Sequence, residues 1–413
     1  MSDFIIIRDL AKRYAAVAAN PRNDALRRLW SDHLSLRPTR APVIVSVGYW
    51  NAWVQDYLDA CLRCEAPFLR ELETQLHIHL LRAESGDDTI FEPWLTCPAI
   101  ATESPSRAWG VSYASEHLNT RGTAARLVSA LHDLNDLSQL KYPAHSFDEE
   151  ATARKAAAWH EALDGILPFE VTRTPLTSFG ADISYALANL RGVEQVMLDM
   201  VEEPEALHRL LAFMRDGILA NHAAGAKAGH WTLSAGYNQV MCYAHELPAP
   251  VANSGPVPMS QIWHHCAAQE FTGVSPAMHE EFLLQYQKPI VEQFGLVTYG
   301  CCEDLSRKID MLRQLRNLRV IAVSPMIGFD GLARCVGQIG TDYVVSWRPS
   351  PADCICNSWN PERVERILRT GLELTRGTRR HIDLKDIQTV QDDPSRIRKF
   401  CDIARRLAEE YGD

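Results

Sequence analysis

The sequence has no long apolar run and no block of basic residues. Its 413 residues include 52 Asp and Glu against 42 Lys and Arg, so the formal net charge is −10. Nucleic-acid backbones are bound by clustered Lys and Arg, which this chain lacks. A bilayer span needs roughly 18 to 20 apolar residues, and the first apolar run, Phe4–Ile7, is short and has no basic flank before it. We therefore expect a cytoplasmic protein with no signal peptide, no membrane span and no nucleic-acid partner.

A disulfide framework is not expected either. The 11 cysteines are an odd number in a chain that is too long to need covalent staples. In a reducing compartment, a cysteine is a buried apolar residue, a nucleophile or a metal ligand. Packing is the role expected for Cys61, Cys64, Cys97, Cys242, Cys335 and Cys401.

No G-x-G-x-x-G motif follows an expected strand, which argues against a dinucleotide-binding fold. Short apolar segments instead alternate with helical patterns. Strands are expected over 42–47, 230–237, 258–263, 296–300, 318–325 and 343–349. Helices are expected over 21–34, 55–83, 124–138, 149–164, 193–201, 205–228, 275–295, 304–315, 328–340 and 360–377. This alternation predicts the α/β class, with a parallel sheet covered by helices, and favours a (β/α)8 TIM-like barrel.

We expect one domain over residues 1–413, with an N-terminal helical elaboration. The N-terminal helices and the first strand would occupy 1–95, the remainder of the barrel 96–380, and a C-terminal helix 381–413. In such a barrel, functional residues lie where strands end at their carboxyl side. The candidate functional residues are therefore those at the carboxyl ends of the expected strands.

Three expected strand ends carry metal-ligating or acidic side chains. They are His264, His265 and Cys266, then Cys301, Cys302 and Glu303, and finally Cys354 and Cys356. Zinc accepts thiolate and imidazole ligands, and a catalytic zinc keeps one position open. Consecutive side chains diverge along a strand, so only one of the adjacent cysteines is expected to face the site. The candidate zinc ligands are His265, Cys301, Cys302 and Cys356, and ordinary packing is the alternative for each.

Other residues near these strand ends are candidates for acid–base chemistry or ligand binding. His264 is a candidate general acid or base. Glu303 is a candidate base, a fourth metal ligand, or simply a carboxylate at a helix start. Candidates for binding a flat ligand or a corrinoid are Tyr49, Trp50, Tyr237, Trp347 and Arg348, and packing is again the alternative for the aromatic residues.

Two segments, 190–211 and 269–305, resemble the uroporphyrinogen decarboxylase superfamily. The most distinctive stretches are V-S-P-A-M-H-E-E-F (274–282) and Y-G-C-C-E (299–303), and the resemblance extends over residues 20–375. It implies a (β/α)8 barrel and is closest to the branch associated with corrinoid-dependent methyltransferases. True uroporphyrinogen decarboxylases hold their tetra-acid substrate with arginines and an aspartate near the first strand, and P-V-I-V-S-V-G-Y-W-N-A-W (42–53) has neither. Uroporphyrinogen decarboxylation is therefore not expected.

The methyltransferase branch holds zinc by an H-x-C motif after one strand and a cysteine after the last strand. Here the H-x-C register falls on Tyr299, Gly300 and Cys301, so tyrosine replaces histidine. Tyr299 becomes a candidate catalytic residue, Cys301 keeps the ligand role, and Cys354 or Cys356 would be the distal thiolate.

The resemblance implies zinc-dependent methyl transfer between a corrinoid or a methylated small molecule and a thiol or tetrahydrofolate-type acceptor. It also implies a separate protein that carries cobalamin and a homodimeric assembly. One alternative is a metal-dependent lyase or decarboxylase that acts on a small natural-product or aromatic acid. The other is a corrinoid- or metal-binding accessory protein that is not an enzyme.

Overall fold

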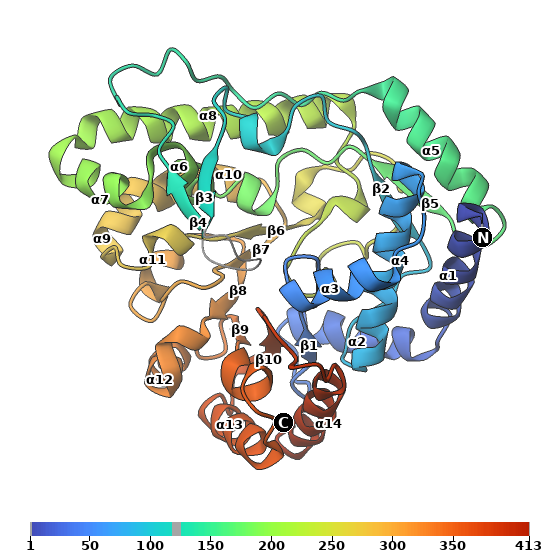
Figure 1. Cartoon of the computed structure of the whole chain (residues 1–413). Coiled ribbons are helices and arrows are strands. Elements are labelled where there is room, and N and C mark those ends of the chain that lie inside the picture. Colours follow the sequence, from blue (N-terminus) through green and yellow to red (C-terminus); the bar gives the residue numbers. More distant parts are fainter. Residues whose placement is uncertain (1, 118–124, 413) are drawn as a thin grey trace.

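The computed structural model describes residues 2–117 and 125–412 and contains a parallel sheet of six strands that curls into a half-barrel (Figure 1). The strand order is β1-β10-β9-β8-β7-β6. The strands are β1 (Val43–Val45), β6 (Trp263–Cys266), β7 (Leu296–Tyr299), β8 (Leu318–Val323), β9 (Val344–Trp347) and β10 (Arg379–Leu384). The α/β class and the parallel sheet are therefore confirmed.

Two expected strands differ from the structure. A 3₁₀ turn at Leu233–Ala235 lies where a strand is expected over 230–237. Another 3₁₀ turn occupies Met259–Gln261, and β6 begins only at Trp263. Proline lacks the N–H that a strand ladder needs, so Pro256 and Pro258 delay the start of this strand. As a result, His264, His265 and Cys266 lie within β6 rather than after it.

Loops occupy the open side of the half-barrel, between β1 and β6. The backbone N–H groups of Val43 and Val45 donate to the side chains of Asp88 and Asp87, at 2.9 and 2.8 Å. At the other edge, the N–H of Tyr237 donates to the carbonyl of Trp263 at 3.2 Å. These groups satisfy strand edges that would otherwise be unpaired. A closed eight-stranded barrel is thus not confirmed among the described residues.

Helices cover the sheet and extend beyond it (Figure 1). They are α1 (Asp3–Ala18), α2 (Arg22–Leu34), α3 (Ala52–Cys61), α4 (Pro67–Ser85), α5 (Glu149–Leu163), α6 (Ser184–Arg191), α7 (Val193–Glu202), α8 (Pro204–Ala228), α9 (Pro276–His279), α10 (Gln285–Val291), α11 (Ile309–Leu312), α12 (Gly328–Ile339), α13 (Pro361–Leu374) and α14 (Ser395–Glu410). Within the described part of the chain, these helices are all too short or too polar to traverse a bilayer.

Four helix expectations need correction. The helix expected over 304–315 is only the short α11, Ile309–Leu312. The helix expected over 55–83 is two helices, because residues 62–66 leave the helical conformation before Pro67. The C-terminal helix expected over 381–413 begins only at Ser395, since β10 extends to Leu384 and a loop covers residues 385–394. In the segment 124–138, residue 124 lies outside the described residues, and β4 (Ala125–Val128) pairs antiparallel with β3 (Ala114–His117).

Alternation along the strands gives the half-barrel an apolar floor. This floor is formed by side chains near the amino ends of the strands, which pack against Trp30 and Leu34 of α2. The strand residues are Ile44, Trp263, Leu296, Val320 and Val344. The alternate residues of the strands pack outward against the covering helices, and include Cys266, Tyr299, Trp347 and Leu384. Because successive side chains point to opposite faces of a strand, the residues in phase with the floor face the interior.

A smaller core lies beside the half-barrel. The strands β2 (Leu95–Pro98) and β5 (Phe169–Thr172) form a parallel pair. Residues of α1, α4 and α5 pack together with this pair, around Tyr14, Leu72 and Trp159. These elements stand together on one side of the molecule in Figure 1.

Candidate active site at the carboxyl end of the half-barrel

The interior above the apolar floor is polar. Arg348 follows β9 and Asp383 belongs to β10, and Arg348 Nε lies 3.3 Å from Asp383 Oδ2. The hydroxyl of Ser46, just after β1, donates to Asp383 Oδ1 at 3.2 Å. Burial raises the pKa of Asp383, and the charge of Arg348 opposes that rise. A buried ion pair costs desolvation energy that an apolar pair would not, so this pair points to a role in the site.

A tight turn after β7 presents the two adjacent cysteines. Gly300 has φ of 101°, and a Cβ there would lie 2.6 Å from Leu305 Cδ1. Glycine is therefore needed at this position. The N–H of Cys301 then donates to Glu303 Oε2 at 2.7 Å, and the N–H of Ala268 donates to Glu303 Oε1 at the same distance. The buried Glu303 carboxylate thus fixes the loops that follow β6 and β7.

The sulfur of Cys301 is surrounded by donors and positive charge. Its Sγ lies 3.7 Å from Cys302 Sγ and 3.7 Å from Lys385 Nζ. Arg348 Nη1 donates to the backbone carbonyl of Cys301. The S–H of Cys302 has the largest effect in lowering the pKa of Cys301, and the charges of Arg348 and Lys385 lower it further. The same contact raises the pKa of Cys302, so the arrangement favours the thiolate at Cys301 and the thiol at Cys302.

His265 faces the interior but has both ring nitrogens engaged. Nδ1 lies 3.0 Å from Ser178 Oγ and Nε2 lies 3.2 Å from the carbonyl oxygen of Gly300. Burial lowers the pKa of His265 to about 3, so the ring is neutral. A carbonyl oxygen only accepts, so Nε2 carries the proton and Nδ1 accepts from Ser178. His265 therefore holds the loops together and has no lone pair directed at Cys301.

Three other candidates lie on the outer face of the sheet. His264 stacks on Phe294 with ring centroids 4.2 Å apart. The hydroxyl of Tyr299 donates to Gln287 Oε1 at 2.7 Å, between the sheet and α10. Trp347 packs so closely over Gly371 of α13 that a Cβ at that glycine would overlap its ring. The structure does not bring these side chains to the sulfur of Cys301.

Cys354 and Cys356 lie in a π-helical turn, Ala352–Cys356, that packs beside α13. Burial raises the pKa of Cys354 to about 12, so this thiol stays protonated. Among residues 2–117 and 125–412, no group of three or more His, Cys, Asp and Glu side chains is placed to hold a metal ion. The set His265, Cys301, Cys302 and Cys356 therefore does not fit a zinc site.

Aromatic side chains are exposed after β1 and in the loop before β6. Tyr49 and Trp50 are each 60% exposed. Tyr237 is also exposed, and its ring meets His265 edge-on, with centroids 5.8 Å apart. These three residues stay candidates for ligand contact. Trp347 is buried but lines the small cavity beside Arg348, so its candidate role stays a prediction as well.

Sequence reasoning missed the part of the site that β10 supplies. Asp383, Lys385 and Asp386 lie in the segment 381–413, where the sequence predicts a helix. The available signal was the alternation of polar and apolar residues over 380–386, R-H-I-D-L-K-D, which is typical of a strand with one polar face. A buried parallel strand is normally apolar on both faces. The inward-facing residues of β10 are polar, so its sequence lacks the continuous apolar run by which such a strand is recognised.

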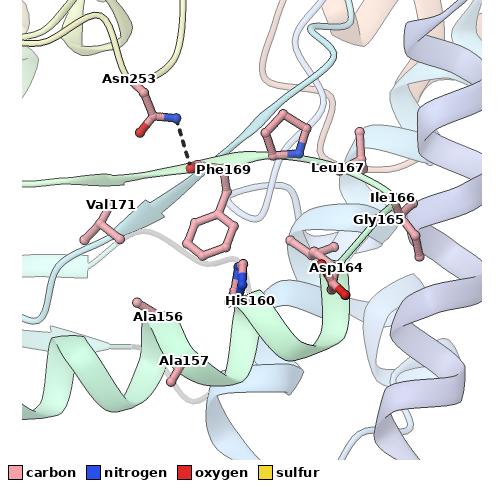
Figure 2. A pocket seen from close by; sticks show the side chains of 12 residues that line it. Ala156, Ala157, His160, Asp164, Gly165, Ile166, Leu167, Phe169, Val171 and Asn253 are labelled. Carbon is pink, nitrogen blue, oxygen red and sulfur yellow. Dashed lines mark hydrogen bonds between the residues drawn. The ribbon is translucent and has the colours of Figure 1, made fainter.

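Two cavities differ in their relation to this site. The larger has a volume of about 890 Å³ and lies between α5 and β5, where Asn253 Nδ2 donates to the carbonyl of Phe169 at 3.3 Å (Figure 2). Its lining is mainly alanine, apolar side chains and the loop Asp164–Pro168, and several of these residues are exposed, so it is a surface hollow beside the smaller core and away from Cys301. The smaller cavity, of about 140 Å³, is lined by Arg348, Ser324 and Ser350 at the ends of β8 and β9. It therefore adjoins the candidate site.

The sequence matches no model of a known protein family, and no curated protein matches it, so the functional argument rests on the geometry of this site.

Proposed function

We propose that this protein is a transferase that uses the thiolate of Cys301 as its nucleophile. The observation that carries the proposal is the placement of Cys301 Sγ 3.7 Å from both Cys302 Sγ and Lys385 Nζ. This cluster lies at the carboxyl end of a parallel sheet, where α/β enzymes place their chemistry. A thiolate that accepts hydrogen bonds and lies beside positive charge is present at neutral pH and can attack carbon.

The burial of Cys301 limits the size of the group that its sulfur can accept. Cys301 is only 6% exposed, so a small electrophile reaches the sulfur more easily than a bulky one. Methyl is the smallest carbon group, and it is the group that the sequence resemblance implies. In the first step, a lone pair of Cys301 Sγ forms a bond to the methyl carbon while the donor keeps the electron pair of its broken bond. A thiol or tetrahydrofolate-type acceptor then gives up its proton to solvent and attacks the methyl carbon. The bond from that carbon to Cys301 Sγ breaks, and its electron pair stays on the sulfur as the thiolate, with no net oxidation.

Lys385 favours a substrate that carries a negative charge. Its Nζ contacts Cys301 Sγ, and its side chain is partly exposed at the mouth. A donor or acceptor that carries a carboxylate or sulfonate would pair with this ammonium beside the sulfur. No step is assigned to zinc, because the described residues do not fit it. A separate corrinoid protein is the methyl source that the resemblance implies, and it remains a proposal, as does a homodimer.

The second candidate is a lyase that acts on a small acid. The observation in its favour is the pair of cations, Lys385 and Arg348, that lie close to Cys301 and would attract a carboxylate. A transferase that works through Cys301 passes through a covalently modified cysteine, whereas a lyase working by proton transfer does not. Detection of the modified cysteine therefore separates the two candidates.

The test is to incubate the protein with methyl iodide and, separately, with methylcobalamin, and to locate the added mass by peptide mass spectrometry. We expect a methyl group on Cys301 that a small anionic thiol, mercaptoacetate, removes. The variant Cys301→Ser should acquire none, while the matched variant Cys356→Ser should behave as the native protein does. Equal labelling of Cys301 and Cys356, or a methyl group that no thiol removes, would contradict the proposal.

A further inference from the structure

We infer that Cys301 and Cys302 form a reversible vicinal disulfide when a hydroperoxide oxidises Cys301, which makes this pair a redox modification site. The inference rests on the same Cys301 thiolate as the proposed function, but not on any transferred group. A disulfide at this position would consume the nucleophile and so stop the transferase reaction until a thiol reduces it.

The two sulfurs are close because their residues lie in a turn rather than in a strand. β7 ends at Tyr299, and Gly300 redirects the chain so that both side chains lie on one side. The sulfurs are 3.7 Å apart, in contact and not bonded. Consecutive side chains in a strand would diverge, so the sequence alone predicts separated sulfurs here.

The surroundings assign different roles to the two cysteines. Cys301 Sγ accepts from Lys385 Nζ at 3.7 Å, which stabilises the negative charge. Cys302 Sγ lies 3.8 Å from Asp386 Oδ2, so its S–H has a carboxylate acceptor as well as the neighbouring thiolate. Cys301 is therefore the sulfur that attacks, and Cys302 is the sulfur that resolves.

Formation of the Cys301–Cys302 disulfide consumes one molecule of hydrogen peroxide. The Cys301 thiolate attacks one peroxide oxygen, the O–O bond breaks, and Cys301 sulfenic acid and hydroxide form. Cys302 then gives its proton to Asp386 and attacks the Cys301 sulfur, and the sulfenic oxygen leaves as water with a proton returned from Asp386. The two sulfurs are oxidised by two electrons in total, and the peroxide is reduced to water and hydroxide.

Backbone geometry makes this disulfide easy to reduce. The Cα atoms of adjacent residues are ~3.8 Å apart across a trans peptide. Unstrained disulfides join Cα atoms that are roughly 4.4 to 6.8 Å apart. A bridge between neighbours is therefore strained, and strained or exposed disulfides are the labile ones. The half-buried Cys302 gives a reducing thiol access to the pair.

The experiment treats the full chain with a small excess of hydrogen peroxide and follows it by peptide mass spectrometry. We expect the peptide that holds both cysteines to lose the mass of two hydrogen atoms, and dithiothreitol to restore it. In Cys302→Ser, the sulfenic acid on Cys301 should accumulate and react with dimedone. In Asp386→Asn, disulfide formation should slow about tenfold, because water replaces the carboxylate as the proton acceptor at this exposed position.

Cys64→Ser provides the matched control, since Cys61 and Cys64 donate to the carbonyls of Leu58 and Asp3 instead of contacting each other. It should form the Cys301–Cys302 bridge at the native rate. Direct oxidation of Cys301 to sulfinic acid while Cys302 is present would overturn the inference, and so would a bridge to any other cysteine. The methylation test scores a different product, so either proposal can fail while the other stands.

Discussion

A free cysteine thiol has a pKa near 8.5 and is mostly protonated at neutral pH, so a reactive cysteine needs an environment that favours its anion. For Cys301, that environment comes from one neighbour in the sequence and from two residues that are distant in it. Cys302 supplies an S–H donor, and the cations Arg348 and Lys385 lie close in space. Most of the other cysteines have the opposite environment, and burial raises the pKa of Cys335 and Cys354 to about 12.

The lowered pKa of Cys301 predicts a pH profile for its alkylation. The rate of reaction with iodoacetamide should stay nearly flat between about pH 5 and pH 8, because the thiolate persists as the pH falls. Cys302→Ala removes the S–H donor and should move the rise of the profile to higher pH. Cys302→Ser keeps a donor and should restore most of the flat region. A native profile that rises steeply through pH 8 would contradict this account of the site.

At the scale of elements, Trp347 serves packing between β9 and α13. It was a candidate for ligand binding, yet its ring lies against Gly371, where no side chain fits. Gly371→Ala should lower the free energy of unfolding by ~1–3 kcal/mol, because the added methyl group forces the ring to move. The measurement is urea denaturation followed by circular dichroism.

Gly337 of α12 is the matched control for that substitution. A Cβ at Gly337 would meet nothing within 4 Å. Gly337→Ala should therefore raise the free energy of unfolding by ~0.5–1 kcal/mol, since alanine is the better helix former. Equal effects at the two glycines would show that helix propensity, and not the contact with Trp347, decides the result.

The buried carboxylate that pairs with the edge of β1 leads to a second prediction at this scale. The carboxylate of Asp88 is fully buried and accepts from Val43 N at 2.9 Å and from Arg40 at 2.7 and 3.0 Å. Asp88→Ala should cost ~3–5 kcal/mol, because it leaves buried donors unpaired. Asp24→Ala removes an ion pair whose carboxylate is 71% exposed, and it should change stability by under about 1 kcal/mol in the same urea titration.

At the scale of the whole molecule, buried histidines link stability to pH. Burial lowers the pKa of His33, His265 and His279 to about 3 each, and it lowers that of His264 as well. In the unfolded chain, histidine has a pKa near 6.5. The unfolded state therefore binds more protons below that pH, so the free energy of unfolding falls as the pH drops from 6.5 toward the folded pKa.

His264→Phe should reduce this pH dependence. Both ring nitrogens of His264 are buried without a hydrogen-bond partner, and the ring already stacks on Phe294. Between about pH 6 and pH 4.5, the slope of the unfolding free energy should decrease by ~1.4 kcal/mol per pH unit, the contribution of one proton. Above pH 7.5, the slopes of variant and native protein should agree. A slope that is unchanged in the acidic range would mean that His264 titrates normally in the folded state.

The sequence by itself determined the class of the fold, most of the helices and the position of the adjacent cysteines. Strands starting at Val43, Leu296, Leu318 and Val344 were predictable because their apolar residues are contiguous in the chain. Helices such as α7, α8 and α13 were predictable because their apolar positions repeat at helical spacing. Contiguous apolar runs and helical spacing are both local patterns, so they can be recognised without knowledge of the tertiary structure.

Only the tertiary structure decided which side chains meet at Cys301. Sheet order places β10 against β1 and β9, and this brings Lys385 and Asp386 to cysteines 84 residues away in the chain. The start of β6 at Trp263 turns His265 inward and His264 outward. A one-residue shift in the pairing register of a strand reverses the face of every side chain in it, and local patterns do not fix that register. Tertiary packing also places Cys356, one of the expected zinc ligands, in a π-helical turn beside α13, a position that no local pattern determines.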